Sequence, residues 1–294
     1  LAIVRSTTGP ANATLGIAGL NVPARTGTTD RGMLFLSSTA GMLGVPTALP
    51  NSNYERIVFT GGLPGGLVRG GTTSNGLGVT NGGMLAPWII DTTNNTFVGY
   101  NAGNGGLYSG DVGFQPLLTT GTTQAQGQIG YSLNSVGTLG TTSTLIPTAS
   151  DIVLLTGSST VVSSGTSLYA LRLNAGQLTG GSLKIGSGGL IYAGNTATDV
   201  ISTPLIAGTG TSELILYAPS AVNGFAISGS IYASGFTKSG GGDVTLSGDN
   251  RGTLTGPIEV AFAGTNWLRL SNQYAVGGNP LNPYALGKDR KSVV

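Results

Sequence analysis

The sequence predicts an all-β protein, most simply a parallel β-solenoid with side loops. Gly accounts for 52 of the 294 residues, and only 8% of the residues are charged. No 12-residue window keeps the apolar spacing of an amphipathic helix without Gly or Pro intruding. Short apolar segments recur instead about every 8–14 residues between Gly, Asn, Ser and Thr clusters, as in a sandwich, a barrel or a solenoid.

Each of these segments is rich in β-branched, Leu or aromatic residues and ends at small polar residues, so each is predicted to be a short strand. The expected strands are 15–20, 32–36, 55–59, 88–91, 151–155, 159–162, 168–173, 182–185, 190–192, 213–217 and 225–232.

The solenoid is favoured over the sandwich and the barrel because the strands are short and hairpin dipeptides are scarce. Asn75-Gly76, Asn81-Gly82 and Asn223-Gly224 are the candidates for tight hairpin turns. With about 20–25 residues per turn of the solenoid, the chain would form on the order of 12 rungs.

Three regions of the chain differ in composition and in the regularity of their strand pattern. Residues 1–150 hold many Pro residues and most of the isolated aromatic residues, and are predicted to be an irregular, loop-rich part of the solenoid. Residues 151–280 have the purer strand pattern and are predicted to be its regular part. Residues 281–294 form a tail, in which Lys288, Arg290 and Lys291 are a solvated charge run.

The composition excludes several classes of function. The chain has no Cys and no His, so disulfides, thiolate nucleophiles, imidazole metal ligands and a Ser-His-Asp triad are all excluded. The net charge is +2 and the basic residues are scattered, unlike the basic stripe of a nucleic-acid-binding protein. No apolar run approaches the roughly 18 residues of a membrane helix, so we expect a protein that does not span the membrane.

The stretch from Phe236 to Leu270 carries the clearest repeat unit. A Gly-rich turn precedes the alternating Val244 and Leu246, a small-residue corner follows, and the chain returns through 258–262 and 267–270. We expect Val244, Leu246, Ile258, Val260, Leu268 and Leu270 to point inward and to stack on successive rungs.

This stretch resembles the autotransporter-associated β-strand repeat of large bacterial surface proteins. The matching positions, called the repeat motif below, are Lys238, Ser239, Gly240, Leu246, Ser247, Gly248, Asn250 and Gly256. The resemblance implies a right-handed parallel β-solenoid, a location outside the cell or on its surface, and no catalytic residues. Segments 167–173 and 183–190 are similar to those that precede this repeat, and 213–217 and 82–88 are looser matches.

Candidate chemical sites have structural alternatives. Asp243 and Asp249 are the carboxylates closest in sequence, but a glycosidase needs a facing pair, and we expect both to accept local backbone N–H bonds in turns. The run Gly240-Gly241-Gly242-Asp243 is similar to one turn of a calcium-binding repeat, but such repeats bind Ca²⁺ in tandem and this run occurs once. Looser binding of Ca²⁺ by loop carbonyl oxygens is an alternative.

Three further features could indicate binding of a nucleotide, attachment of a glycan or binding of a sugar, and each has a structural explanation. The run 103–108 begins like a dinucleotide fingerprint but lacks the third Gly and a following helix, so we expect a tight turn. The sequons at Asn12 and Asn94 have little meaning in a bacterial protein. Trp88 and Trp267 could stack on sugars, but both lie beside apolar residues and are expected in the core. No cofactor or metal is expected.

The sequence therefore predicts a structural, non-enzymatic segment of an extracellular fibre or surface protein. Open strand edges at both ends of a solenoid would pair with further copies and build a filament. A carbohydrate-binding or host-surface-binding adhesin passenger domain is the alternative. A polysaccharide lyase or hydrolase on the same scaffold is a weaker one.

Overall fold

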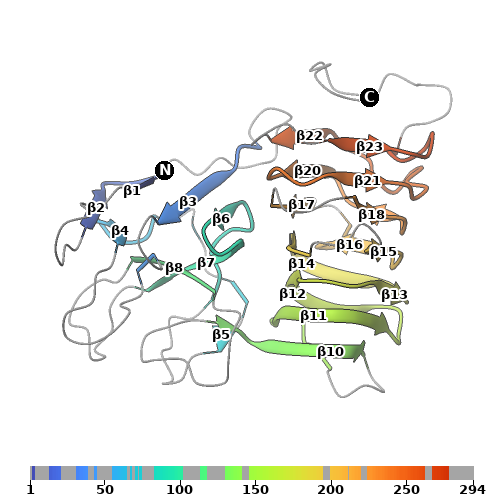
Figure 1. Ribbon diagram of the computed structural model, residues 1–294, viewed down its shortest axis with the longest axis horizontal. Coiled ribbons are helices and arrows are strands. Elements are labelled where there is room, and N and C mark those ends of the chain that lie inside the picture. Colours follow the sequence, from blue (N-terminus) through green and yellow to red (C-terminus); the bar gives the residue numbers. More distant parts are fainter. Residues whose placement is uncertain are drawn as a thin grey trace. The chain divides into compact units, whose positions relative to one another are not determined.

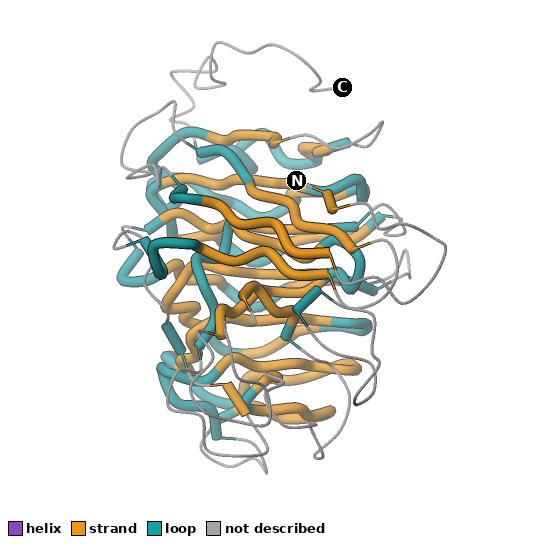
Figure 2. The backbone as a smooth tube through the Cα atoms, turned by 90° about the vertical axis from the view of Figure 1, so that its left-hand side faces the viewer, coloured by secondary structure: helices purple, strands orange, loops and turns teal. Residues whose placement is uncertain are grey.

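The computed structural model consists of strands and loops, and no helix occurs among the residues that it describes (Figure 2). That part of the chain accordingly holds no helix able to cross a membrane. The described residues are 2–3, 13–20, 31–38, 43–44, 55–64, 67, 70–71, 73–74, 83–101, 113–117, 130–140, 146–194, 199–210, 212–219, 224–261 and 267–277.

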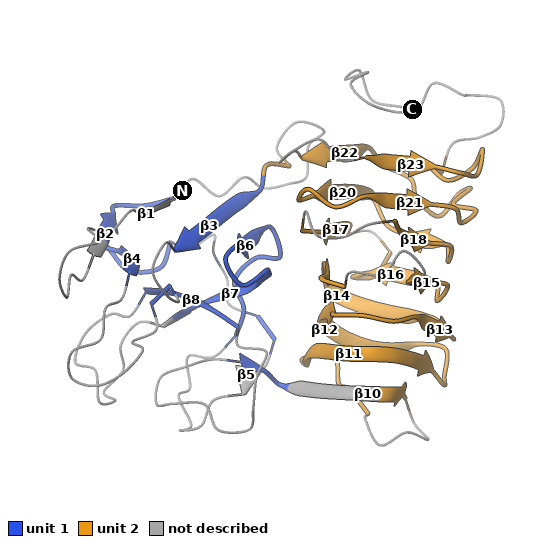
Figure 3. Ribbon diagram, viewed as in Figure 1, with its two compact units in different colours: residues 1–24, 33–132 blue, residues 25–32, 133–294 orange. Residues whose placement is uncertain are grey.

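The chain divides into two compact units, coloured separately in Figure 3. Unit 1 comprises 1–24 and 33–132, and unit 2 comprises 25–32 and 133–294. The boundary therefore lies at 132/133 and not near 150, because strand β10 already pairs in parallel with β11 of the regular part.

Unit 1 is a mixed β structure. Strand β3 pairs in parallel with β1 and β6, whereas β6, β7 and β8 form an antiparallel meander. The rings of Phe59, Tyr100 and Phe114 pack together with centroids 5.2–5.4 Å apart. The antiparallel pairs differ from the loop-rich solenoid expected here. The strands are β1 (Ala2–Ile3), β2 (Ala13–Ile17), β3 (Leu34–Ser38), β4 (Glu55–Phe59), β5 (Thr73–Ser74), β6 (Ile89–Asp91), β7 (Thr96–Asn101), β8 (Gly113–Pro116) and β9 (Gly130–Tyr131).

Unit 2 is a parallel β-solenoid, seen as the stack from β10 to β22 and β23 in Figure 1, so the predicted fold class is confirmed. Its strands are β10 (Leu133–Leu139), β11 (Ile152–Val161), β12 (Thr166–Leu173), β13 (Leu178–Gly180), β14 (Leu183–Tyr192), β15 (Val200–Ile201), β16 (Leu205–Ala207), β17 (Glu213–Tyr217), β18 (Phe225–Ile227), β19 (Ile231–Tyr232), β20 (Gly235–Ser239), β21 (Val244–Leu246), β22 (Ile258–Ala261) and β23 (Leu268–Leu270).

The strands of unit 2 form three parallel stacks. The first follows β11, β12, β14, β17, β20 and β22, the second follows β11, β13, β15, β18, β21 and β23, and the third joins the first halves of β12 and β14 to β16 and β19. The first stack describes about five turns, not the expected dozen. Fewer rungs form because most of the first 132 residues belong to unit 1.

Columns of inward side chains make the core of unit 2. Register partners place Val153, Leu171, Leu190 and Leu216 one above another, and each is fully buried. The number of residues per turn varies. Leu155 pairs with Leu173, 18 residues later, whereas Ile191 pairs with Tyr217, 26 residues later. Such variation is absorbed in the corners, so the columns continue from rung to rung.

The expected inward residues take their predicted columns, but their burial is uneven. Val244 and Leu246 are fully buried and pair with Leu268 and Leu270. Val260 lies in the column of Leu216 and is nevertheless 37% exposed. Ile258 and Leu270 are half-buried. These less buried residues all belong to β22 and β23, the last described rung, which no further described strand covers.

Candidate functional site

The repeat motif spans the last two described rungs, and its first part lies in strand β20 and the corner after it. Lys238 and Ser239 are the last two residues of the strand, and the Gly-rich turn begins at Gly240. The Lys238 Nζ donates a hydrogen bond to the Gly240 carbonyl at 2.7 Å, and the Ser239 hydroxyl donates to the Leu216 carbonyl at 3.2 Å. Gly240 has a φ of +76°, and a Cβ there would overlap the Ala218 carbonyl oxygen.

The second part of the motif forms the corner after β21. The Ser247 hydroxyl donates to the Ile227 carbonyl at 3.4 Å, and a Cβ on Gly248 would press against the Gly229 carbonyl. Asn250 is 1% exposed, accepts from the Ile231 N–H at 2.7 Å and donates to the Ala275 carbonyl at 2.6 Å. Asn250 thereby joins three successive rungs.

Gly256 completes the motif before β22. A Cβ at this position would overlap the carbonyl oxygen of Ser234 on the preceding rung. The motif positions therefore act on the backbone: they let adjacent corners approach closely, or they satisfy buried polar groups between rungs. None of these contacts forms a reactive pair.

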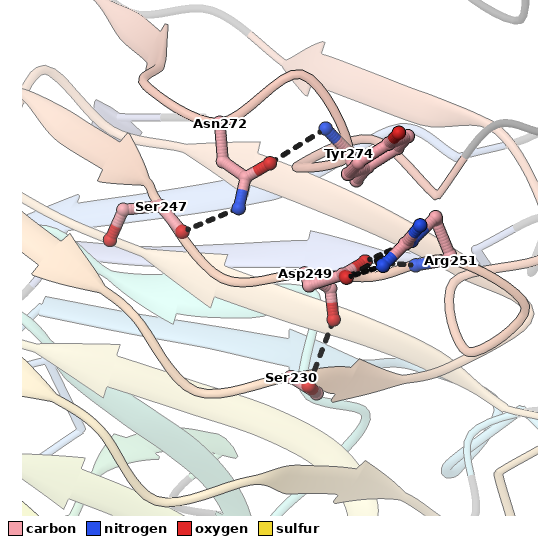
Figure 4. Close-up of polar contacts among 6 residues, drawn as sticks. All are labelled: Ser230, Ser247, Asp249, Arg251, Asn272 and Tyr274. Atoms are coloured by element: carbon pink, nitrogen blue, oxygen red, sulfur yellow. Dashed lines mark hydrogen bonds and ion pairs between the residues drawn. The ribbon is translucent and has the colours of Figure 1, made fainter. Parts of the chain in front are cut away.

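The exposed polar groups of this corner form a small cluster with an aromatic ring (Figure 4). Arg251 and Asp249 form an ion pair at 2.5 Å, and the Arg251 guanidinium lies 3.9 Å from the centre of the Tyr274 ring. The hydrogen bond from Arg251 lowers the pKa of the Asp249 carboxyl below its ordinary value. Asp249 also accepts from the Arg251 N–H at 3.1 Å, as expected of a turn residue.

Asp243 differs from the prediction. Its carboxylate accepts from the Trp267 N–H at 2.9 Å, which is a bond to the next rung and not a local turn bond, and it lies 3.5 Å from the Arg269 guanidinium. Trp267 is 40% exposed, so its expected place in the core is wrong. Trp267 immediately precedes β23 on the last described rung, where no described strand stacks on it. Trp88, in contrast, is 6% exposed, as expected.

The described carboxylates form no cluster that could hold a metal ion. Asp243 and Asp249 lie at opposite ends of β21, and each is already held by N–H groups. No group of three or more Asp or Glu residues in the described part of the chain could hold a metal ion. Asp91 is fully buried, and burial raises its pKa against the opposing hydrogen bonds from Thr93 and Asn94.

Some predicted features lie outside the described residues. These are the 103–108 turn, the Asn12 sequon and the tail with Lys288, Arg290 and Lys291. The Asn94 sequon lies in the turn between β6 and β7, where the Asn94 amide donates to Asp91.

Sequence reasoning missed the buried polar groups of unit 2. Arg31 lies 3.1 Å from Glu213, whose carboxylate also accepts from the Thr237 hydroxyl. Tyr192 donates to Asp199 while its ring stacks on Phe225 at 3.9 Å. The signal available was a charged or polar residue within a strand of apolar residues, as in Leu171-Arg172-Leu173, but it does not reveal the partner.

Comparison with known proteins adds no functional assignment, because no protein family, no curated protein and no solved structure matches this chain.

Proposed function

We propose that the chain is a structural segment of an extracellular fibre or surface protein, that it assembles end to end by β-strand stacking, and that it performs no catalysis. The observation that carries this proposal is the incomplete burial of the last described rung. Val260 is 37% exposed there, whereas Leu216, two rungs earlier in the same column, is fully buried.

A second copy of the chain would fit this surface because its own rungs have the same spacing and alternation. Parallel strands about 4.8 Å apart would continue the ladder from β22 and β23. Each new backbone hydrogen bond contributes about 0.5–1.5 kcal/mol net, and burial of apolar area adds about 25 cal/mol per Å². Such a contact is heterologous and does not close, so it extends into a filament.

Matched variants test this assembly. Val260→Asp places a charge on the last described rung, whereas Tyr232→Asp places one at a similarly exposed side chain, 41% exposed in β19, away from both β10 and β22. Static light scattering should show concentration-dependent assembly of the natural protein and of Tyr232→Asp, and loss of assembly in Val260→Asp. A natural protein that stays monomeric at every concentration would refute the proposal.

Salt separates strand stacking from attraction between charges. Stacking should change little between 0.1 M and 1 M salt, over which the Debye length falls from about 10 Å to about 3 Å. If the assemblies dissociate at 1 M salt, the protein still forms a fibre, but attraction between charges and not strand stacking holds it together.

A second candidate function, binding of carbohydrate or a host surface, is favoured by the exposed Trp267 beside Asp243 and Arg269. An exposed aromatic face next to hydrogen-bonding groups suits a sugar ring. Titration calorimetry with neutral oligosaccharides should then detect binding that is lost in Trp267→Ala and kept in Tyr232→Ala, whose side chain is similarly exposed at 41%. The weaker lyase or hydrolase alternative gains no support from the separated carboxylates.

A further inference from the structure

Segment 25–32 belongs to the solenoid unit, although the residues before and after it belong to unit 1. The described residues of this segment are Arg31 and Gly32. The strands that Arg31 contacts come much later in the sequence, in β17 and β20. Chain connectivity therefore does not keep Arg31 beside the solenoid, and its contacts there must do so.

The Arg31 side chain contacts two neighbouring strands of the first stack. Its Nη1 lies 3.1 Å from the Oε1 of Glu213, the first residue of β17. The Thr237 hydroxyl of β20 donates to the same carboxylate oxygen. Glu213 is also the register partner of Gly235, the first residue of β20. We call Glu213, Gly235 and Thr237 together the arginine site.

Gly235 gives the arginine site its shape. A Cβ at this position would overlap the Arg31 guanidinium, and its three nearest atoms would all belong to that group. The guanidinium thus occupies the space that a side chain on β20 would fill, as at other strand glycines that another group approaches closely. A lysine would not replace it, because a compact ammonium lacks the planar fork of donors that matches a carboxylate.

We propose that the arginine site is a releasable latch that holds segment 25–32 to the solenoid and selects arginine. Arg31 and Glu213 neutralise each other, so docking leaves neither charge unpaired. Emptying the site leaves the solenoid folded, because the inward residues of β17 and β20, among them Leu214, Leu216 and Phe236, belong to its core. The latch adds a second attachment between the two units, besides the chain connection at 132/133. It is independent of the end-to-end assembly proposed above.

Trypsin cleavage of the natural protein measures the state of the latch. Trypsin cuts after Arg and must take that side chain into its own pocket, which Arg31 cannot enter while it occupies the arginine site. Cleavage between Arg31 and Gly32 therefore follows the fraction of chains in which the site is empty. Mass spectrometry should show this bond cut about 100-fold more slowly in the full chain than in a synthetic peptide of residues 28–36. Equal rates would overturn the proposal.

Variants locate the protection. Gly235→Ala should speed this cleavage by about tenfold or more, because the methyl group takes the place of the guanidinium while both charges stay. Glu213→Gln removes the counter-charge and should act in the same way, as should Arg31→Lys, after which trypsin also cuts. Gly32→Ala is the matched control, because a Cβ there meets nothing within 4 Å, and it should keep the natural rate. Protection that survives in Gly235→Ala, or that is lost equally in Gly32→Ala, would overturn the proposal.

The bond after Lys238 separates release of the latch from unfolding of the solenoid. Lys238 lies in the same strand as Gly235 and is 1% exposed, so trypsin reaches it only when that strand opens. In every variant this bond should be cut as slowly as in the natural protein, and the circular dichroism spectrum should be unchanged. Cleavage after Lys238 that rises together with cleavage after Arg31 would show that the segment and the solenoid open as one, and would refute a separate latch.

Discussion

The Oδ1 of Asn250 accepts a hydrogen bond from the backbone N–H of Ile231, 19 residues earlier in the sequence and one rung away. The other end of the same amide donates to Ala275 on the following rung. One short side chain thus replaces the strand ladder at a corner where the backbone turns away from its neighbours, and it leaves neither buried backbone group unsatisfied.

Replacing Asn250 with Ala should destabilise the protein by about 3 kcal/mol, because two buried backbone groups lose their partner at roughly 1–3 kcal/mol each. Urea unfolding followed by circular dichroism measures this change. Asn272→Ala is the control. The Asn272 side-chain amide also forms two hydrogen bonds in a corner: it donates to the Ser247 carbonyl and accepts from the Tyr274 N–H. Asn272 is half-buried, so water can replace these hydrogen bonds. Equal losses in the two variants would show that burial of the Asn250 amide is unimportant.

Replacing Gly256 with Ala should cost about 3 kcal/mol, since the new methyl group overlaps the Ser234 carbonyl and the backbone of two rungs must separate. Gly19→Ala serves as the comparison, because a Cβ at Gly19 meets nothing within 4 Å. Thermal unfolding of both variants decides the matter. A Gly256→Ala protein as stable as Gly19→Ala would mean that the corner has room that the structure does not show.

Replacing Leu246 with Asp should destabilise the solenoid by about 4 kcal/mol, because an unpaired charge would enter the column between Ile227 and Leu270. Thr245→Asp, on the outer side of the same three-residue strand and half-buried, should cost less than 1 kcal/mol. Comparing their unfolding midpoints tests the assignment of inward and outward sides; a reversed order would contradict it.

The regular part of the fold could be predicted from the sequence, since alternation of apolar residues determines which side of a strand is buried. The predicted strands 55–59 and 213–217 agree with β4 and β17 at both ends. The antiparallel meander β6–β7–β8 could not be predicted in this way, because strand pairing between distant segments leaves no local pattern. The buried position of Lys238 could not be predicted, because a lysine in a core column looks, in sequence, like a surface residue.

The candidate site was predictable only as a set of structural positions. Gly240, Gly248 and Gly256 lie where adjacent corners approach closely. A Gly-rich pattern predicts such close approach, but it does not predict a chemical function. The exposure of Trp267 and Val260 depends on what lies beyond the last described rung, and neighbouring residues in the sequence do not determine that.

Lys238 supplies a prediction about pH. It occupies the inward column between Leu216 and Val260 and is 1% exposed. Burial lowers the pKa of its ammonium group from 10.5 to about 8, although the nearby Asp243 opposes this shift. Below pH 8 both the folded and the unfolded chain carry the proton, so the cost of burying the charge is fully present.

As the pH rises from about 8 to 10.5, the folded chain releases this proton while the unfolded chain keeps it. The unfolded state then binds more protons, so the free energy of unfolding should increase with pH, by roughly 3 kcal/mol at 1.36 kcal/mol per pKa unit. Lys238→Met should remove this increase and should be more stable than the natural protein at pH 7, because an unbranched apolar side chain fits the column.

Chemical unfolding of both proteins at intervals from pH 7 to 10 measures the difference between them. The difference is more informative than either curve, because burial raises the pKa of Tyr169, and this shift lowers the stability of both proteins above pH 10. The difference in unfolding free energy should shrink steadily from pH 8 upward. A constant difference across this range would mean that Lys238 keeps its charge in the folded protein, with the Gly240 carbonyl and Asp243 compensating for its burial.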